Sequence, residues 1–213
     1  MNRSMTWARW MLVVLAPAAT VVSASPATPA RFDALDSQSR TIALTDDAGA
    51  RQTPFAGFSI HPLRGGEWTL VTLYVMFREV VDGDARRRES YWVARRVTGD
   101  DSPRAKATPE IRWASSDACE ALDGLVRGIG EVIGDRLEIG VPGDGDPTET
   151  ASDNVRYSLW TTEGRFRGTA LATTVNLAST GGSPIAEWAD HGLAATQSCW
   201  TGTTMPGATT GPG

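Results

Sequence analysis

The sequence predicts an α+β fold in which two helices pack on one face of a mostly antiparallel sheet and are stapled by one disulfide. Three observations lead to this prediction. Several runs of β-branched, aromatic and apolar residues are separated by glycine-containing turns, which is typical of strands joined as hairpins. Two further segments repeat apolar residues at helical spacing. Each of these two segments also carries one of the chain's two cysteines.

The N-terminus has the pattern of a secretory signal peptide. Residues 1–9 carry two cations, Arg3 and Arg9, and no acidic residue. An apolar run follows over 10–19, and Val22-Ser23-Ala24 supplies small residues for a cleavage site. The apolar run is shorter than the roughly 20 residues that a transmembrane helix needs. We therefore assign residues 1–24 to a signal peptide. We expect an exported protein, periplasmic or secreted, that keeps no integral membrane span after cleavage.

The remainder of the chain divides into three parts. Residues 25–40 begin with small residues and prolines, and we expect them to form a flexible lead-in. Residues 41–200 form the predicted single α+β domain. Residues 201–213 consist mostly of glycine, proline and threonine, which cannot bury an apolar face, so we expect a disordered tail. Lys106 is the only lysine, and this preference for arginine is typical of a GC-rich bacterial genome.

The predicted sheet is built around one hairpin. Residues 68–81 are apolar on both faces, which is typical of a central strand covered on both sides. Asp82-Gly83-Asp84 supplies a tight turn, and residues 90–98 return as the partner strand. Further strands are expected at 41–44, 55–61, 136–141, 155–162 and 169–177.

Two helices follow from apolar periodicity and end signals. The first is expected to begin at Asp117, because Glu120 three residues later resembles a capping box. The second has Ser183 as its cap and Pro184 at its first position, which is a favoured arrangement at helix N-termini.

The two cysteines predict how these helices are arranged. In an exported protein an even number of cysteines favours a disulfide, here between Cys119 and Cys199. Closing a loop of this length stabilises a fold by roughly 4–5 kcal/mol in the chain-entropy model. Because one cysteine begins the first helix and the other ends the second, we expect the helices to be antiparallel. The alternative is that Cys119 is a nucleophilic thiol activated by a helix N-terminus.

Catalytic and metal sites find little support in the sequence. The only histidines are His61 and His191, and no Gly-x-Ser-x-Gly turn marks a nucleophile. The acidic turn over 142–150 starts like a calcium loop but lacks the glycine and the distal glutamate of an EF-hand. We therefore assign no catalytic residue, no metal ligand and no cofactor.

Arginine and tryptophan supply the candidate binding residues. They follow the predicted hairpin turn and continue along its returning strand: Arg86, Arg87, Arg88, Trp92, Arg95 and Arg96. Acidic residues lie close by, so a hairpin that neutralises its own charge is the simplest interpretation. The alternative is an anion-recognition face for a carboxylated polymer or a lipid phosphate.

These observations favour a non-enzymatic binding or envelope-associated domain. A net charge of −5 disfavours nucleic-acid binding, which depends on neutralising phosphates. The expected partner is an envelope polymer or another exported protein. Two alternatives stay open at this point, namely a secreted hydrolase whose site the sequence does not reveal and an inhibitor or immunity-type protein.

Overall fold

A computed structural model describes residues 32–47, 49–102, 108–134, 154–165, 172–200 and 202–206. Three predicted features lie outside the described residues: the signal peptide, the strand at 136–141 and the acidic turn at 142–150. Most of the predicted C-terminal tail also lies outside them. Each of these features therefore stays a prediction.

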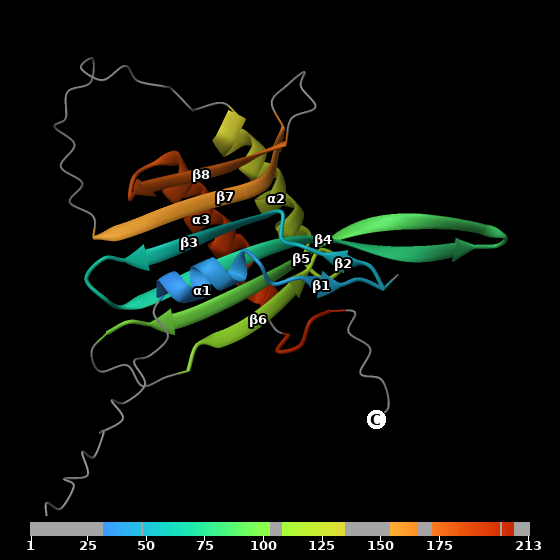
Figure 1. Ribbon diagram of the computed structural model, residues 1–213, viewed down its shortest axis with the longest axis horizontal. Coiled ribbons are helices and arrows are strands. Elements are labelled where there is room, and N and C mark those ends of the chain that lie inside the picture. Colours follow the sequence, from blue (N-terminus) through green and yellow to red (C-terminus); the bar gives the residue numbers. More distant parts are fainter. Residues whose placement is uncertain are drawn as a thin grey trace, which may run out of the picture.

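Six strands form one antiparallel sheet in the order β6-β5-β4-β3-β7-β8 (Figure 1). The strands are β3 (Ala56–Pro62), β4 (Glu67–Asp82), β5 (Ala85–Asp100), β6 (Glu110–Ser115), β7 (Val155–Arg165) and β8 (Ala172–Thr180). The predicted central hairpin is confirmed as β4 and β5, which pair from Glu67–Asp100 to Asp82–Ala85. Gly83 has a φ of 60°, which suits the first position of a two-residue hairpin turn.

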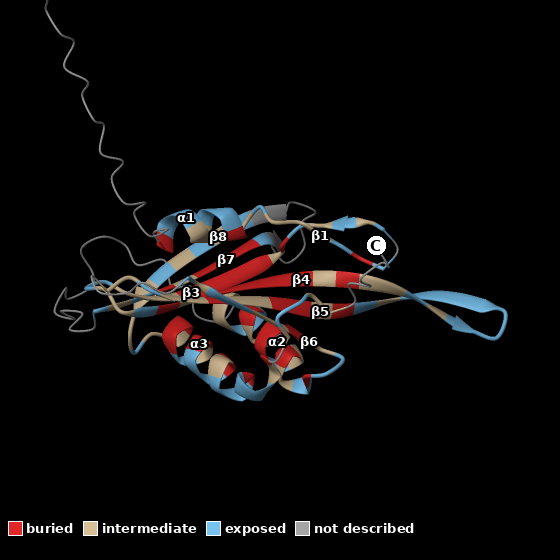
Figure 2. Ribbon diagram, turned by 90° about the horizontal axis from the view of Figure 1, so that it is seen from below, coloured by how far each residue is buried: buried red, intermediate tan, exposed pale blue. Residues whose placement is uncertain are grey.

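Two helices cover one face of this sheet (Figure 2). They are α2 (Glu120–Gly134) and α3 (Pro184–Ala195), and a short 3₁₀ helix, η1 (Gln197–Cys199), follows α3. Ser183 caps α3 as predicted, because its side chain accepts a hydrogen bond from the Ala186 N–H at 3.1 Å. We call this side of the sheet the helix face.

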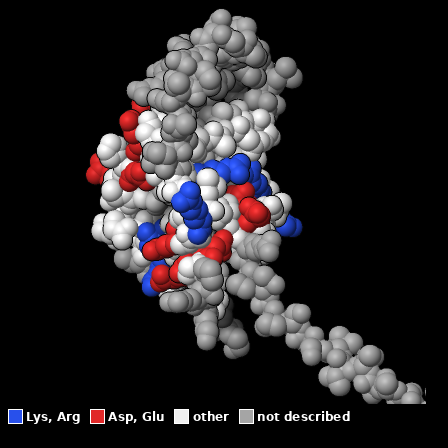
Figure 3. Space-filling view, turned by 90° about the vertical axis from the view of Figure 1, so that its left-hand side faces the viewer, with Lys and Arg blue, Asp and Glu red and all other residues white. Residues whose placement is uncertain are grey.

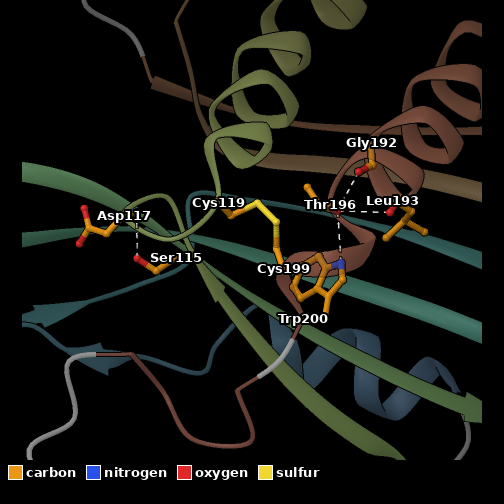
Figure 4. Close-up of a disulfide and its surroundings, with 8 residues drawn as sticks. All are labelled: Ser115, Asp117, Cys119, Gly192, Leu193, Thr196, Cys199 and Trp200. Atoms are coloured by element: carbon orange, nitrogen blue, oxygen red, sulfur yellow. Dashed lines mark hydrogen bonds between the residues drawn. A yellow bond between two sulfur atoms is a disulfide. The ribbon is translucent and has the colours of Figure 1, made fainter.

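The disulfide between Cys119 and Cys199 is confirmed, with 5.7 Å between the two Cα atoms (Figure 4). It joins the start of α2 to the segment just after α3. Buried Thr196 supports the same corner, because its hydroxyl donates to the Gly192 carbonyl at 2.7 Å and accepts from the Trp200 indole at 3.2 Å. The bonded cysteine pair leaves no thiol nucleophile at Cys119.

The start of α2 differs from the predicted capping box. The helix begins at Glu120, so Asp117 lies in the preceding turn. Its carboxylate accepts a hydrogen bond from Arg78 at 2.5 Å. A charge-assisted bond of this kind is about twice as strong as a neutral one, which explains why the carboxylate turns toward the arginine.

The opposite face is covered by a third helix, α1 (Phe32–Ser39), and by a hairpin of β1 (Leu44–Thr45) and β2 (Arg51–Gln52). We call α1 and this hairpin together the N-terminal strap, and the side they cover the strap face. The sequence did not predict α1, which lies within the range 25–40. Phe32 packs on Trp68, Leu70 and Val97, so the helix depends on contacts with residues distant in sequence.

Strand β4 lies at the centre, as its apolar pattern predicted. Val71 and Leu73 point into the helix face, whereas Leu70 and Tyr74 point into the strap face, and all four are fully buried. Close packing also explains Gly57 on neighbouring β3. A Cβ atom added there would lie 2.6 Å from the Trp160 ring, so only glycine fits.

Candidate functional site

The β4–β5 hairpin extends beyond the sheet as a two-stranded ribbon. Strand β3 pairs with β4 only as far as Leu73, and β6 pairs with β5 only from Val93 onward. The ribbon continues past these points and projects from the body (Figures 1 and 2). We call residues 77–90 the arm. Its distal residues are exposed, including Val81 at 64%.

The three consecutive arginines lie on the arm and are paired with acidic side chains. Their side chains are between 54% and 77% exposed. Arg86 lies 4.0 Å from Glu79, and Arg87 lies 2.7 Å from Glu89. Exposed pairs of this kind contribute only about 0–1 kcal/mol to stability. The geometry agrees with a hairpin that neutralises its own charge.

The base of the arm is fixed to the body by Arg88, the last of these three arginines, and by Arg78. Arg88 lies 3.5 Å from Asp46 of the strap and stacks 4.0 Å over the Phe77 ring. Arg78 contacts Asp117, and these contacts raise the pKa of the Arg78 guanidinium, chiefly through its hydrogen bond to that carboxylate. The arm is therefore anchored to the body at its base.

The other predicted binding residues lie on the sheet and are separated by its two faces. Arg95 points to the strap face, 6.0 Å from the centre of the Trp113 ring. Arg96 points to the helix face, 4.9 Å from the Trp200 ring. Trp92 also lies on the helix face and packs against Phe55. Arg95 lies seven residues from Arg88, about 24 Å along a strand, so the six predicted residues do not form one patch.

A groove between the two helices brings together one histidine and two carboxylates. Its volume is about 340 Å³, and its lining residues are Gly128, Glu131, Val132, Pro184, Glu187, Trp188 and His191. The second half of α2 therefore faces the first half of α3, which, with the disulfide at the other ends, confirms the predicted antiparallel arrangement.

The two acidic residues of this groove were not among the site residues predicted from the sequence. Glu187 and His191 are four residues apart on a helix, so their shared face could have been recognised from spacing alone. Glu131 comes from the other helix, and only packing places it there.

The second histidine lies apart from the groove. His61 on β3 stacks on Phe32, with 4.1 Å between ring centres, and its Nε2 lies 3.4 Å from the Asp101 carboxylate.

Within the described ranges, no group of three or more His, Cys, Asp or Glu side chains is placed to hold a metal ion. Among the same residues, no helix has the length and apolar character to cross a membrane.

Charge is mixed rather than segregated at the end of the molecule opposite the arm. Figure 3 shows arginine and acidic side chains interspersed there. One contact of this kind joins Arg112 and Glu110 on the edge strand β6.

No family model, curated protein or solved structure matches the chain.

Proposed function

We propose that this protein is an exported, non-enzymatic binding protein of the bacterial envelope whose arm contacts another exported protein. The projecting ribbon is the observation that carries the proposal. Most of the arm packs against nothing in the described part of the chain, so it contributes little to the core. A long exposed hairpin with a fixed base is suited to reach a partner.

The arm offers two kinds of contact to a protein. In the described residues, the outer edges of β4 and β5 have no strand partner along the arm, so an extended segment of another chain can add to either edge. Paired arginine and glutamate side chains then select the register, because like charges placed opposite each other are unfavourable. The arm therefore fits a partner with an extended segment of mixed charge.

Two observations support export. The N-terminal pattern is that of a signal peptide. The Cys119–Cys199 disulfide is also consistent with an oxidising compartment such as the periplasm or the extracellular medium.

Site-specific photo-crosslinking in intact cells tests the contact. A crosslinking residue at Val81 on the arm is compared with one at Leu63, which is similarly exposed at 58% but lies in the β3–β4 loop. We expect a discrete protein adduct at Val81 that is absent at Leu63 and is weakened by Arg87→Glu. Equal labelling at both positions, or no adduct at Val81, contradicts the proposal.

The groove favours a second candidate, a secreted hydrolase. Its volume falls within the range of about 300–1,000 Å³ that is usual for small-ligand sites. A histidine beside carboxylates is a common acid–base arrangement. To separate the two candidates, the hydrolytic activity of the parent is compared with that of His191→Ala on model ester and peptide substrates. The crosslinking variants serve as controls, because they keep the groove. An activity that His191→Ala removes would establish the hydrolase.

An inhibitor or immunity-type function remains a special case of the leading proposal. In that case the protein crosslinked at Val81 is an enzyme whose activity falls when the complex forms. Identifying the crosslinked protein and measuring its activity in the complex therefore distinguishes an inhibitor from a protein with a structural partner.

A further inference from the structure

Two buried hydroxyls without partners and a half-buried arginine lie together on the strap face. The hydroxyl oxygens of Thr72 and Tyr74 are buried and have no hydrogen-bond partner. Arg95 makes no ion pair or hydrogen bond within the described part of the chain, and its recorded contact is with the Trp113 ring. Buried polar groups are almost always satisfied, so two unpaired hydroxyls beside an arginine that lacks a carboxylate require an explanation.

Strand register places the three groups side by side. Thr72 on β4 is directly opposite Arg95 on β5, and Arg95 is in turn directly opposite Trp113 on β6. Tyr74 lies two residues beyond Thr72 on the same face of β4. The guanidinium of Arg95 is therefore flanked by a hydroxyl on one side and an indole on the other.

Arg95 lacks the carboxylate partner that several arginines of similar exposure have, and unlike Arg96, which hydrogen-bonds to Gln197, it has no polar side-chain partner in the described part of the chain. The side chains of Arg40, Arg112 and Arg78 are 32%, 33% and 37% exposed, and each contacts an aspartate or a glutamate. Burial lowers the pKa of Arg95 from its ordinary value, whereas it raises the pKa of Tyr74 to about 12. At neutral pH the site thus presents a positive charge and a neutral hydroxyl donor.

We propose that Thr72, Tyr74 and Arg95 form a subsite for the carboxylate of an apolar ligand that binds beneath the N-terminal strap. The guanidinium and the two hydroxyls all donate hydrogen bonds, and a carboxylate accepts several. Apolar side chains lie next to the subsite, namely Met76, Tyr91 and Val93, with Leu44 of the strap packed on them. An apolar ligand body takes the place of Leu44.

Binding requires the strap to move. Both hydroxyl oxygens are inaccessible to solvent while it is closed. Leu44 comes from a hairpin of two residues per strand, whose buried Asp46 lies 3.5 Å from Arg88. A short covering element opens locally at a lower free-energy cost than a continuous core, so we expect the ligand to enter by opening of the strap. The subsite does not rest on the function proposed for the arm, although opening of the hairpin breaks the contact between Asp46 and Arg88.

Thermal unfolding with three matched compounds tests the subsite. Decanoate combines a carboxylate with an apolar chain, 1-decanol has the chain alone, and acetate has the carboxylate alone. We expect decanoate to raise the Tm of the full mature protein in a saturable manner, whereas equal concentrations of 1-decanol or acetate do not. An absence of this shift, or an equal shift with 1-decanol, overturns the proposal.

Two variants connect the shift to the named residues. Arg95→Met removes an unpaired charge, so we expect a ligand-free Tm at or above that of the parent and no decanoate shift. Arg96→Met changes the opposite face and should keep the shift. If Arg95→Met does not fold, Arg95 is required for the fold, and its assignment to the ligand subsite is overturned.

Tyr74→Phe gives a milder test that does not depend on Arg95. It removes one hydroxyl and keeps the ring in the apolar cluster, so the variant should fold. We expect decanoate to bind at least five-fold more weakly. An unchanged affinity would show that the hydroxyl does not contact the carboxylate and would overturn the assignment.

Discussion

The two faces of the central sheet are held by different means. On the helix face, one continuous core joins α2 and α3 to the strands, and a disulfide crosses between the helices. On the strap face, two separate clusters of four buried residues each are covered by α1 and a short hairpin. Polar groups without partners also lie on the strap face, at Thr72 and Tyr74.

This difference indicates a division of roles. A continuous, crosslinked core opens only when the whole domain unfolds, whereas a cover held by small clusters opens locally. The helix face therefore supplies stability, and the strap face is the side on which binding can be coupled to a conformational change. The following predictions test that contrast, from the largest expected effect to the smallest.

The largest effect is expected for Leu73→Asp. Leu73 is fully buried in the helix-face core, so the variant places an unpaired carboxylate among apolar side chains. The cost is several kcal/mol, comparable to the whole stability of a typical domain, which is about 5–15 kcal/mol. Circular dichroism should show an unfolded or strongly destabilised protein. Leu63→Asp, at an exposed position, is the control, and equal unfolding temperatures for Leu73→Asp and the parent would show that β4 is not central.

Removal of the disulfide should have the next largest effect. Cys119 and Cys199 are separated by 80 residues in sequence, and a loop of that length corresponds to about 4–5 kcal/mol in the chain-entropy model. Urea unfolding of the parent should shift to lower urea on reduction. The double variant with both cysteines changed to serine should unfold at the reduced parent's midpoint and should not respond to reductant. If reductant leaves the urea midpoint of the parent unchanged, the disulfide does not stabilise the fold.

Loosening of the strap should have a local effect. Phe32 anchors α1 on Trp68, Leu70 and Val97, so Phe32→Ala removes the main contact of that helix. We expect faster hydrogen exchange in α1 with little change in β4. Leu122→Ala in the helix-face core should instead cost about 2–5 kcal/mol and speed exchange throughout the sheet. Global loss of protection in Phe32→Ala would mean that the two faces unfold together.

Alkaline titration provides a smaller test at the strap face. Burial raises the pKa of Tyr74 from 10.0 to about 12, so the unfolded chain releases this proton first. The contribution of Tyr74 to stability is thus complete below about pH 10 and is lost as the pH rises toward 12. Urea unfolding at pH values on either side of this range should show a larger loss for the parent than for Tyr74→Phe. Identical losses would place Tyr74 in a solvated environment.

Arg87→Glu on the arm should change stability least. Arg87 is exposed and contacts Glu89, so we expect a change within about 0.5 kcal/mol. The same variant should weaken the crosslinked complex, because it reverses a charge at the proposed contact. A marked loss of thermal stability would show that the arm is part of the folded core.

Much of the fold could be predicted because its signals are local. The alternation over 68–81 identified a central strand, and β4 is indeed covered on both faces. Ser183 and Pro184 identified the start of α3 through its cap and its first position. The single pair of cysteines required no choice of partner, and the disulfide follows from it.

The candidate sites were less predictable because they depend on long-range contacts. Arg86–Arg88 and Arg95–Arg96 are close in sequence, yet the length of β5 and its two faces separate them. The arm exists as a free ribbon because β3 and β6 are shorter than the strands they flank. No local pattern states how far a neighbouring strand will pair.

The sequence by itself determined the fold class, the central hairpin and the crosslink between the helices, since hydrophobic periodicity and cysteine count are properties of short segments. Only the tertiary structure decided where α1 packs, which carboxylate Arg78 contacts and which polar groups remain unpartnered beside Arg95. Each of these depends on side chains brought together from distant positions, as Phe32 is with Trp68. Such contacts are selected by the packing of the whole domain, and no single segment encodes them.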